Sequence, residues 1–180
     1  MNELTRLASL EDLPVAGRTM EIFADPVERA SIARRLDLAG LDRFEARLHL
    51  SRGPREGIVI LRGNLEIDAT QTCVVTLDPV AMIMEILIER YFSLCGRSDD
   101  DGDHAGEDEE IVVGIDNEEP EPLVNCLLDV GEIAVEELSL SLDPYPRSPG
   151  ADEMMRRFQE DNIDPNGPFA RLRSLRDGGH

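Results

Sequence analysis

Phe44-Glu45-Ala46-Arg47-Leu48-His49-Leu50 decides the fold class, because apolar and polar residues alternate along it. Successive side chains of a strand point to opposite faces, so this alternation predicts a half-buried β-strand. Strand character returns over 58–61 and, after a break at Gly63-Asn64, over 65–69. A period-two apolar row from Val80 to Ile88 predicts another strand, with a helix as the alternative because Met, Leu and Glu favour helices.

A helix is predicted to begin at Asp25-Pro26-Val27-Glu28. Asp suits the N-cap, Pro the first helical position, and Glu at the third position can reach back to the cap amide. Apolar residues at helical spacing then predict the buried face, and Gly40 is expected to close the segment. That face comprises Val27, Ala30, Ala33 and Leu36.

A second helix is predicted from Asp129-Val130-Gly131-Glu132, which has the pattern of another capping box. Val130, Ile133, Ala134 and Leu138 define its apolar face. The helix must end at Asp143-Pro144-Tyr145-Pro146, because each Pro biases the residue before it away from helical geometry.

These segments together predict an α+β fold, with an antiparallel β-sheet and two or three helices. We expect a single domain over residues 1–180, with a short returning strand at 111–115. Residues 97–110 contain too few apolar groups to offset the entropy of ordering and are predicted to form a disordered acidic loop. Residues 147–180 are predicted to form an extended, irregular C-terminal tail.

Charge is unevenly divided along the chain. Residues 98–146 carry seventeen carboxylates and no Arg, and the chain, with a formal net charge of −20, contains no Lys. Residues 1–97 carry fifteen acids against twelve Arg, and residues 147–180 carry six against six. Such segregation concerns partners and solubility more than fold, and indicates two electrostatically different surfaces.

The sequence favours a soluble cytoplasmic protein with no membrane association. The N-terminus lacks the basic and apolar regions of a signal peptide. The longest apolar-rich stretch, Val80 to Leu94, is interrupted by three charged residues and is too short to span a bilayer. Three cysteines at unrelated spacings fit a reducing compartment.

Motifs of nucleotide-binding and hydrolytic enzymes are absent from the sequence: there is no G-x-x-x-x-G-K-[ST], no G-x-G-x-x-G opening a helix and no G-x-S-x-G. The three histidines, His49, His104 and His180, lie far apart and none neighbours a cysteine. The acidic loop fails the EF-hand pattern whether Gly102 or Gly106 takes the sixth position. We therefore expect a non-enzymatic protein without cofactor, metal or small-molecule substrate.

Cys73 lies where a C-x-x-C pair would begin, but Thr76 takes the place of the second cysteine. A thiolate pair at that spacing can bind zinc or cycle redox states, whereas one thiol cannot. We expect Cys73 to pack as a small apolar residue.

Arginines in the N-terminal half allow two interpretations. They could form one phosphate-binding patch, because clustered cations drive counterion release, or they could pair with nearby Glu and Asp. The second is favoured, because the chain has no Lys and a net charge of −20. The candidate RNA-contacting residues are Arg29, Arg34, Arg35 and Arg47.

Three stretches resemble motifs of the YceD family, the large ribosomal RNA subunit accumulation proteins. The stretch Cys73-Val74-Val75-Thr76-Leu77-Asp78-Pro79-Val80 is similar to the family's C-x-R-C-L-x-P-V core. Residues 127–146 resemble its D-L-G-E-L-x-x-E-x-L-x-L-x-L block with a Pro-rich exit, and Pro168-Phe169-Ala170-Arg171-Leu172 resembles its closing N-P-F-A-x-L. Order and spacing agree from about Glu21 to Arg176, and the family also has an acidic loop between the first two motifs.

The candidate motif positions are Cys73, Leu77, Pro79, Asp129, Gly131, Glu132, Glu137, Leu138, Pro144, Tyr145, Pro146, Pro168 and Phe169. Thr76 replaces the second cysteine of the family pattern, so no metal or redox role is carried over to this chain. Val75 replaces the basic residue between the cysteines, so that candidate RNA contact is not carried over either. The alternative is that the motif residues have a structural role and do not contact a partner, because a residue that precedes proline is conformationally restricted in any case.

The resemblance implies a cytoplasmic factor that supports 23S ribosomal RNA accumulation and ribosome biogenesis. Its expected partners are the 23S rRNA precursor, ribosomal proteins or assembly factors. The alternative is an acidic protein–protein interaction module with no ribosomal role. Candidate residues for binding a basic partner are Asp99, Asp100, Asp101, Asp103, Glu107, Asp108, Glu109 and Glu110.

Overall fold

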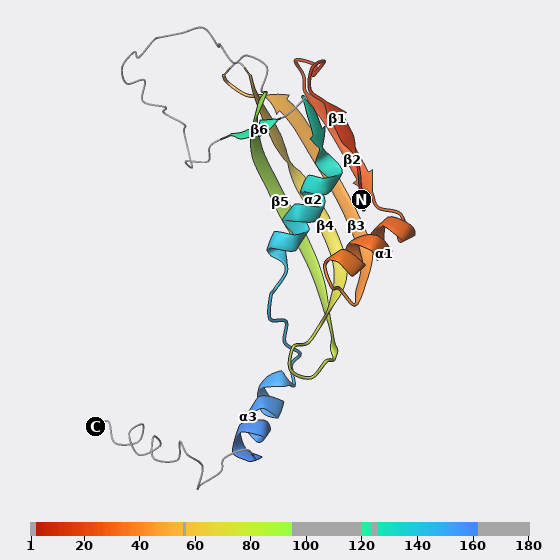
Figure 1. Ribbon diagram of the computed structural model, residues 1–180, viewed down its shortest axis with the longest axis vertical. Coiled ribbons are helices and arrows are strands. Elements are labelled where there is room, and N and C mark those ends of the chain that lie inside the picture. The colour runs from red at the N-terminus through yellow and green to blue at the C-terminus, as the bar shows by residue number, and fades with distance from the viewer. Residues whose placement is uncertain (1–2, 56, 95–119, 124–125, 162–180) are drawn as a thin grey trace, which may run out of the picture. The chain divides into compact units, whose positions relative to one another are not determined.

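A five-stranded β-sheet forms the main part of the computed structural model, which describes residues 3–55, 57–94, 120–123 and 126–161 (Figure 1). The described chain divides into two units. The sheet unit comprises the described residues of Met1–Gln71 and Ala81–Asp143, and the loop unit those of Thr72–Val80 and Pro144–His180. The elements are β1 (Leu7–Ser9), β2 (Arg18–Phe23), α1 (Pro26–Arg35), β3 (Gly40–Arg52), β4 (Ile58–Thr72), β5 (Pro79–Leu94), β6 (Glu121–Leu123), β7 (Leu127–Asp129), α2 (Val130–Ser141) and α3 (Ala151–Asp161).

The strand order in the large sheet is β2-β3-β4-β5-β6. β2 and β4 both pair with β3 in antiparallel fashion, whereas the short β6 runs parallel to β5 and meets only Phe92–Leu94. A separate antiparallel ribbon joins β1 to β7. The α+β prediction is confirmed, and the Val80–Ile88 row is a strand, not a helix.

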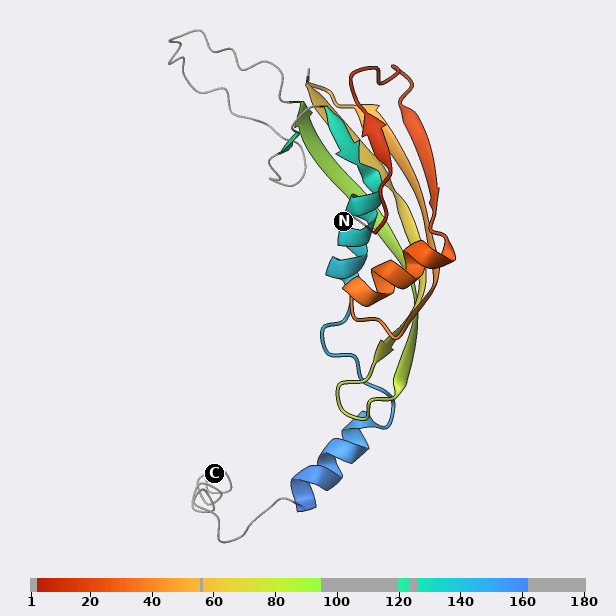
Figure 2. The ribbon, with the colours of Figure 1, turned by 45° about the vertical axis from the view of Figure 1, so that its right-hand side comes forward.

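One face of the sheet carries the core, as an antiparallel sheet with alternating side chains requires. α1, α2 and the β1–β7 ribbon cover this face (Figure 2). Phe44, Leu48, Leu65 and Ile67 of the central strands are buried there, and Leu138 of α2 is fully buried in the same cluster. The predicted apolar face of α2 is confirmed, since Val130, Ile133, Ala134 and Leu138 are all buried.

The other face of the sheet is polar and held by cross-strand ion pairs. Arg47 lies 3.8 Å from Glu21 of β2, Arg43 pairs with Glu66 of β4, and Arg62 lies 2.7 Å from Glu89 of β5. His49 is on this face, as its alternation predicts, with Nδ1 3.0 Å from the Thr19 hydroxyl. Exposed pairs of this kind contribute little to stability, about 0–1 kcal/mol each, but they neutralise the arginines.

Two expectations for α1 are corrected. The start is confirmed, with Asp25 as N-cap, but the buried residues are Ile32 and Ala33, and Val27 is exposed. The helix ends at Arg35 and not at Gly40, which begins β3. Asp37 takes the left-handed conformation after the helix (φ 54°), a role that Asp tolerates better than most residues.

The predicted break at Gly63-Asn64 is wrong, because β4 continues through both residues. A Cβ built on Gly63 would lie 2.1 Å from the Arg47 carbonyl oxygen and 2.9 Å from the Leu48 Cα. Gly63 therefore marks a close approach of the β3 backbone rather than a turn.

Five elements escaped prediction: β1, β2, β6, β7 and α3. α3 corrects part of the expected irregular tail, since residues 151–161 are helical. The predicted disordered loop at 97–110, the returning strand at 111–115 and the motif at 168–172 lie outside the described residues.

Replacing Gly63 by Ala is expected to lower the free energy of unfolding by about 1–3 kcal/mol, because overpacked sites must shift to make room. Urea unfolding followed by circular dichroism measures the change. Gly40→Ala in β3 is the matched control, since its Cβ would meet nothing closer than 4.0 Å. Equal stability of the two variants would show that β3 and β4 are not in such close contact at Gly63.

Candidate functional site

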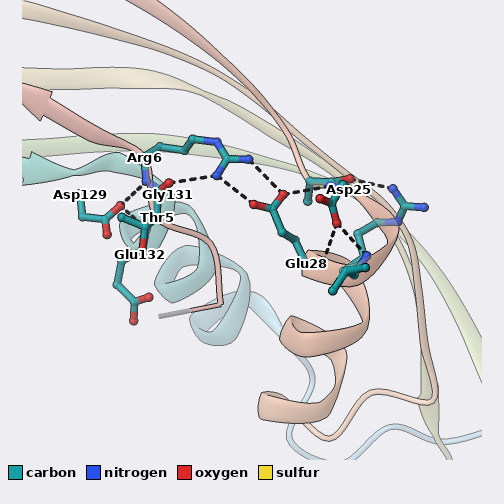
Figure 3. A network of polar contacts seen from close by, with 10 residues as sticks. Thr5, Arg6, Asp25, Glu28, Asp129, Gly131 and Glu132 are labelled. Carbon is teal, nitrogen blue, oxygen red and sulfur yellow. Dashed lines mark hydrogen bonds and ion pairs between the residues drawn. The ribbon is translucent and has the colours of Figure 1, made fainter. Parts of the chain in front are cut away.

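Arg6 links the N-terminal segment to the first turn of α1 (Figure 3). Its guanidinium donates to both Glu28 carboxylate oxygens, at 2.9 and 3.0 Å. Glu28 Oε2 also accepts the Asp25 backbone N–H at 2.9 Å, and Asp25 accepts the Glu28 amide at 2.8 Å. The hydrogen bond from Arg6 lowers the pKa of Glu28, against the opposing effect of burial, and the Asp25 amide adds to the lowering.

Asp129 gathers three backbone donors on one carboxylate oxygen. Its Oδ1 accepts the N–H groups of Arg6 at 2.8 Å, Gly131 at 3.1 Å and Glu132 at 3.3 Å. The first belongs to the N-terminal segment and the other two to the first turn of α2. One side chain thus caps the helix and holds the segment against it.

The next motif residues reinforce this junction. A Cβ on Gly131 would lie 2.5 Å from the Leu4 carbonyl oxygen, so only Gly admits the N-terminal segment at this distance. The Glu132 carboxylate, which a full capping box would direct to the Asp129 amide, instead binds the Arg35 guanidinium at 2.6 and 3.0 Å. Asp129, Gly131 and Glu132 therefore connect the N-terminal segment, α1 and α2, and their geometry accounts for the motif structurally.

The two later motif positions of α2 have different roles. Leu138 is fully buried in the core. Glu137 accepts from Arg90 Nη1 at 2.9 Å, and Arg90 also lies near Glu121 of β6 and Glu136 of α2. One guanidinium therefore faces three carboxylates, which leaves an excess of negative charge beside β5.

In the loop unit, two motif stretches that are far apart in sequence come together. The Val74 N–H donates to the Pro146 carbonyl at 2.9 Å, and the Thr76 hydroxyl lies 2.9 Å from that of Ser148. A backbone bond from Cys73 N to the Asp78 carbonyl at 2.8 Å closes the loop between them. Thr76, where the family motif has cysteine, is thus part of this polar contact.

Cys73 is buried, as expected, and its sulfur is also a hydrogen-bond acceptor. Its Sγ accepts backbone N–H groups from Val75 at 3.4 Å, Thr76 at 3.3 Å and Ser148 at 3.2 Å. Burial opposes ionisation of this thiol, but hydrogen bonds from Thr76 and Ser148 outweigh it and lower the pKa of Cys73 to about 6. Donors aimed at one sulfur stabilise the thiolate.

The motif side chains Leu77 and Tyr145 of the loop unit are large and exposed, at 75% and 71% exposure. Leu77 adopts a left-handed backbone (φ 62°) that turns the chain toward Pro79, which begins β5. Pro144 is exposed and follows the C-cap of α2, whereas Pro146 is buried. Leu77 and Tyr145 are therefore the apolar motif residues best placed to touch a partner.

The candidate RNA-contacting arginines divide into two pairs. Arg35 lies 3.0 Å from Glu3 and 2.6 Å from Glu132, and Arg47 lies 3.8 Å from Glu21. Arg29 and Arg34 instead line an open depression of about 550 Å³ between α1 and the start of β3. Arg29 also donates to the Ala24 carbonyl at 2.7 Å, and Asp37 adds a negative charge to the same depression. Arg29, Arg34 and Arg35 thus belong to α1, whereas Arg47 belongs to β3.

The eight acids proposed to bind a basic partner, Asp99 to Glu110, lie outside the described residues, as do Pro168 and Phe169. Within the described ranges, no three His, Cys, Asp or Glu residues are grouped so that they could hold a metal ion. No helix in the described part of the chain has the length and apolar character needed to cross a membrane.

Comparisons with protein-family models, with curated proteins and with solved structures give no match to this chain.

Sequence reasoning missed three residues that organise these sites: Arg6, Arg90 and Ser148. Each acts on groups distant in sequence, with Arg6 paired to Glu28, Arg90 to Glu137 and Ser148 to Cys73. The only sequence signal was Arg90 itself, the one basic residue in an apolar-rich strand.

Replacing Asp129 by Ala is expected to lower the free energy of unfolding by about 1–2 kcal/mol, because α2 loses its cap. The loss of the Arg6 contact should also increase hydrogen exchange in the Leu4–Arg6 segment. Asp12→Ala, at an exposed position, should stay within about 0.5 kcal/mol of the parent. Unchanged exchange in Asp129→Ala would contradict the joint role of the carboxylate.

The Cys73 thiol is expected to titrate near pH 6, as read from the pH dependence of its ¹³Cβ chemical shift. Because the folded pKa lies below the unfolded value, the free energy of unfolding should rise with pH up to about 9, the ordinary pKa of the thiol, and this gain should be lost as pH falls through about 6. Thr76→Val removes one donor and should raise the pKa. An identical titration in this variant would show that the Thr76 hydroxyl does not stabilise the thiolate.

Proposed function

We propose that this protein is a non-enzymatic, cytoplasmic factor that supports accumulation of 23S ribosomal RNA and assembly of the large ribosomal subunit. The resemblance of its motifs to those of the YceD family supports the ribosomal role. One structural observation supports the manner of action: several arginines of the sheet unit are paired with carboxylates of the same chain, whereas the acids of the chain are in excess.

The pairing of arginines argues for a basic protein as the direct partner rather than RNA. Arg35, Arg43, Arg47, Arg62 and Arg90 all contact carboxylates of the same chain. An arginine already paired must give up that contact before it binds phosphate, which reduces the gain from counterion release. RNA is then reached through the bound protein.

The acidic segment supplies the opposite charge. Residues 98–121 contain twelve carboxylates and no basic residue apart from His104. Such a segment competes with RNA phosphate for the lysines and arginines of a ribosomal protein and prevents non-specific capture. The folded units would hold the complex while the protein is delivered to the rRNA precursor.

The alternative is a protein–protein interaction module without a ribosomal role. A specific observation favours it: the loop unit exposes Leu77, Tyr145 and two apolar residues of α3, Met154 and Phe158. Large apolar residues exposed in this way are available for contact with a partner protein. A partner bound through these residues and unrelated to the ribosome would support this alternative.

The test is an affinity pull-down of the tagged full-length protein from native lysate of its source, with and without RNase. Large-subunit ribosomal proteins that survive RNase, together with 23S precursor that does not, are the expected result. One non-ribosomal protein and no rRNA would overturn the proposed function.

Replacing the eight acids from Asp99 to Glu110 by Asn and Gln is expected to weaken binding of the recovered ribosomal protein. The affinity should also become less dependent on salt concentration. The physical reason is that ion contacts released by salt set the slope of affinity against ionic strength. Neutralising exposed Glu11, Asp12 and Asp42 serves as the control. An unchanged salt slope in the eight-residue variant would contradict the competition mechanism.

A further inference from the structure

β5 has a long edge without a partner strand in the described part of the chain. β4 lies on one side of β5, and on the other side β6 pairs only with Phe92–Leu94. From Ala81 to Tyr91 that second edge therefore meets no described strand. Every second residue of such an edge directs its backbone N–H and C=O groups outward, which is a template for pairing with another chain.

Ala81–Tyr91 has few of the usual protections of an edge strand, since its only charged side chains are Glu85, Glu89 and Arg90. The segment contains no Pro and no Lys, and it is long. Ile83 and Leu87 are 84% and 81% exposed on the outer face. On the inner face, Met82, Met84 and Ile86 are only partly buried against the core. An added strand would therefore bury apolar side chains on both of its faces.

The charge around this edge is acidic. Glu85 and Glu89 alternate with Ile83 and Leu87 on the outer face, and Glu121, Glu136 and Glu137 surround Arg90. Among the described ion pairs of these five carboxylates, only Arg62 and Arg90 supply positive charge. The complementary occupant is a strand with basic and apolar residues.

A second copy of the chain fits this edge poorly. In an antiparallel β5–β5 pairing, the register that places Ile83 opposite Leu87 also places Glu85 opposite Glu85. Like charges directly opposite each other destabilise a strand pair. Each chain also carries a net charge of −20, which adds repulsion between copies.

We propose that β5 binds an extended basic segment of a partner protein as an added strand along Ala81–Tyr91. On its outer face the partner strand presents apolar residues to Ile83 and Leu87 and basic residues to Glu85 and Glu89. Main-chain hydrogen bonds supply affinity, and the alternating side chains supply specificity. This inference rests on the proposed function, because the proposed function identifies the partner as a basic protein.

The probe is a fluorescein-labelled peptide, Arg-Thr-Val-Thr-Arg-Thr-Val-Thr-Arg, titrated with the full-length protein and followed by anisotropy. The double variant I83K/L87K is expected to weaken binding by about tenfold or more, since charges on an edge strand block pairing. E85Q/E89Q should weaken binding and reduce its salt dependence. The double variant V15K/V27K is the matched control, because it adds the same charge at residues that are 95% and 74% exposed and are not on this edge.

Two further measurements distinguish strand addition from simple charge attraction. Two peptides are compared, one N-methylated at the odd-numbered residues and one at the even-numbered residues. One of them should lose binding and the other should keep it, because only one of the two sets of amides faces β5. Peptide binding should also slow hydrogen exchange of the amides within 81–91. The proposal would be overturned if the two N-methylated peptides bound equally well, or if I83K/L87K left peptide binding unchanged.

The state of the edge in the protein alone is decisive as well. The outward-facing amides of 81–91 should exchange rapidly in the protein without peptide. If they are already protected from hydrogen exchange, another segment of the chain or a second copy covers the edge, and the proposal is wrong. Light scattering separates these two causes. The peptide assay needs no ribosome, so normal peptide binding without rRNA in the pull-down would overturn the proposed function but not strand addition by β5.

Discussion

The Asp129 carboxylate is the interaction on which the covering layer of the sheet depends. Its Oδ1 caps α2 and receives the Arg6 amide, and Arg6 in turn reaches Glu28 in the first turn of α1. The Gly131 backbone passes so close to Leu4 that no side chain fits between them. One acidic oxygen and one missing Cβ therefore fix how three sequence-distant segments lie together over the core. The motif residues Asp129, Gly131 and Glu132 therefore have structural roles in this layer.

Local chemistry in the sequence predicted much of the fold. The capping box at Asp25 and Glu28 and the alternation of 44–50 depend on neighbours a few residues apart, so they can be read directly. The buried face of α1 could not, because Ile32 is selected over Val27 by the segments that pack on the helix. Gly63 was misread for the same reason, since its role is set by Arg47 and Leu48 on another strand.

The candidate sites were less predictable than the fold. Cys73 was read as apolar because its sulfur donors come partly from Ser148, across a long sequence separation. The arginines were open to two interpretations because a sequence gives charges without distances. In the structure Arg35 and Arg47 contact carboxylates, whereas Arg29 and Arg34 line a depression beside α1.

The parallel pairing of β6 with the end of β5 has a consequence for how the chain tolerates change. Phe92 lies opposite Glu121 in the register, so the two ends of the intervening segment are anchored side by side in the sheet. For a flexible connection between fixed ends, each doubling of length costs only about 0.6 kcal/mol. The pairing of Phe92 with Glu121 therefore sets the short distance that any sequence placed between Leu94 and Glu121 has to span, and for a flexible insert the entropic cost to the sheet unit would grow only slowly with length.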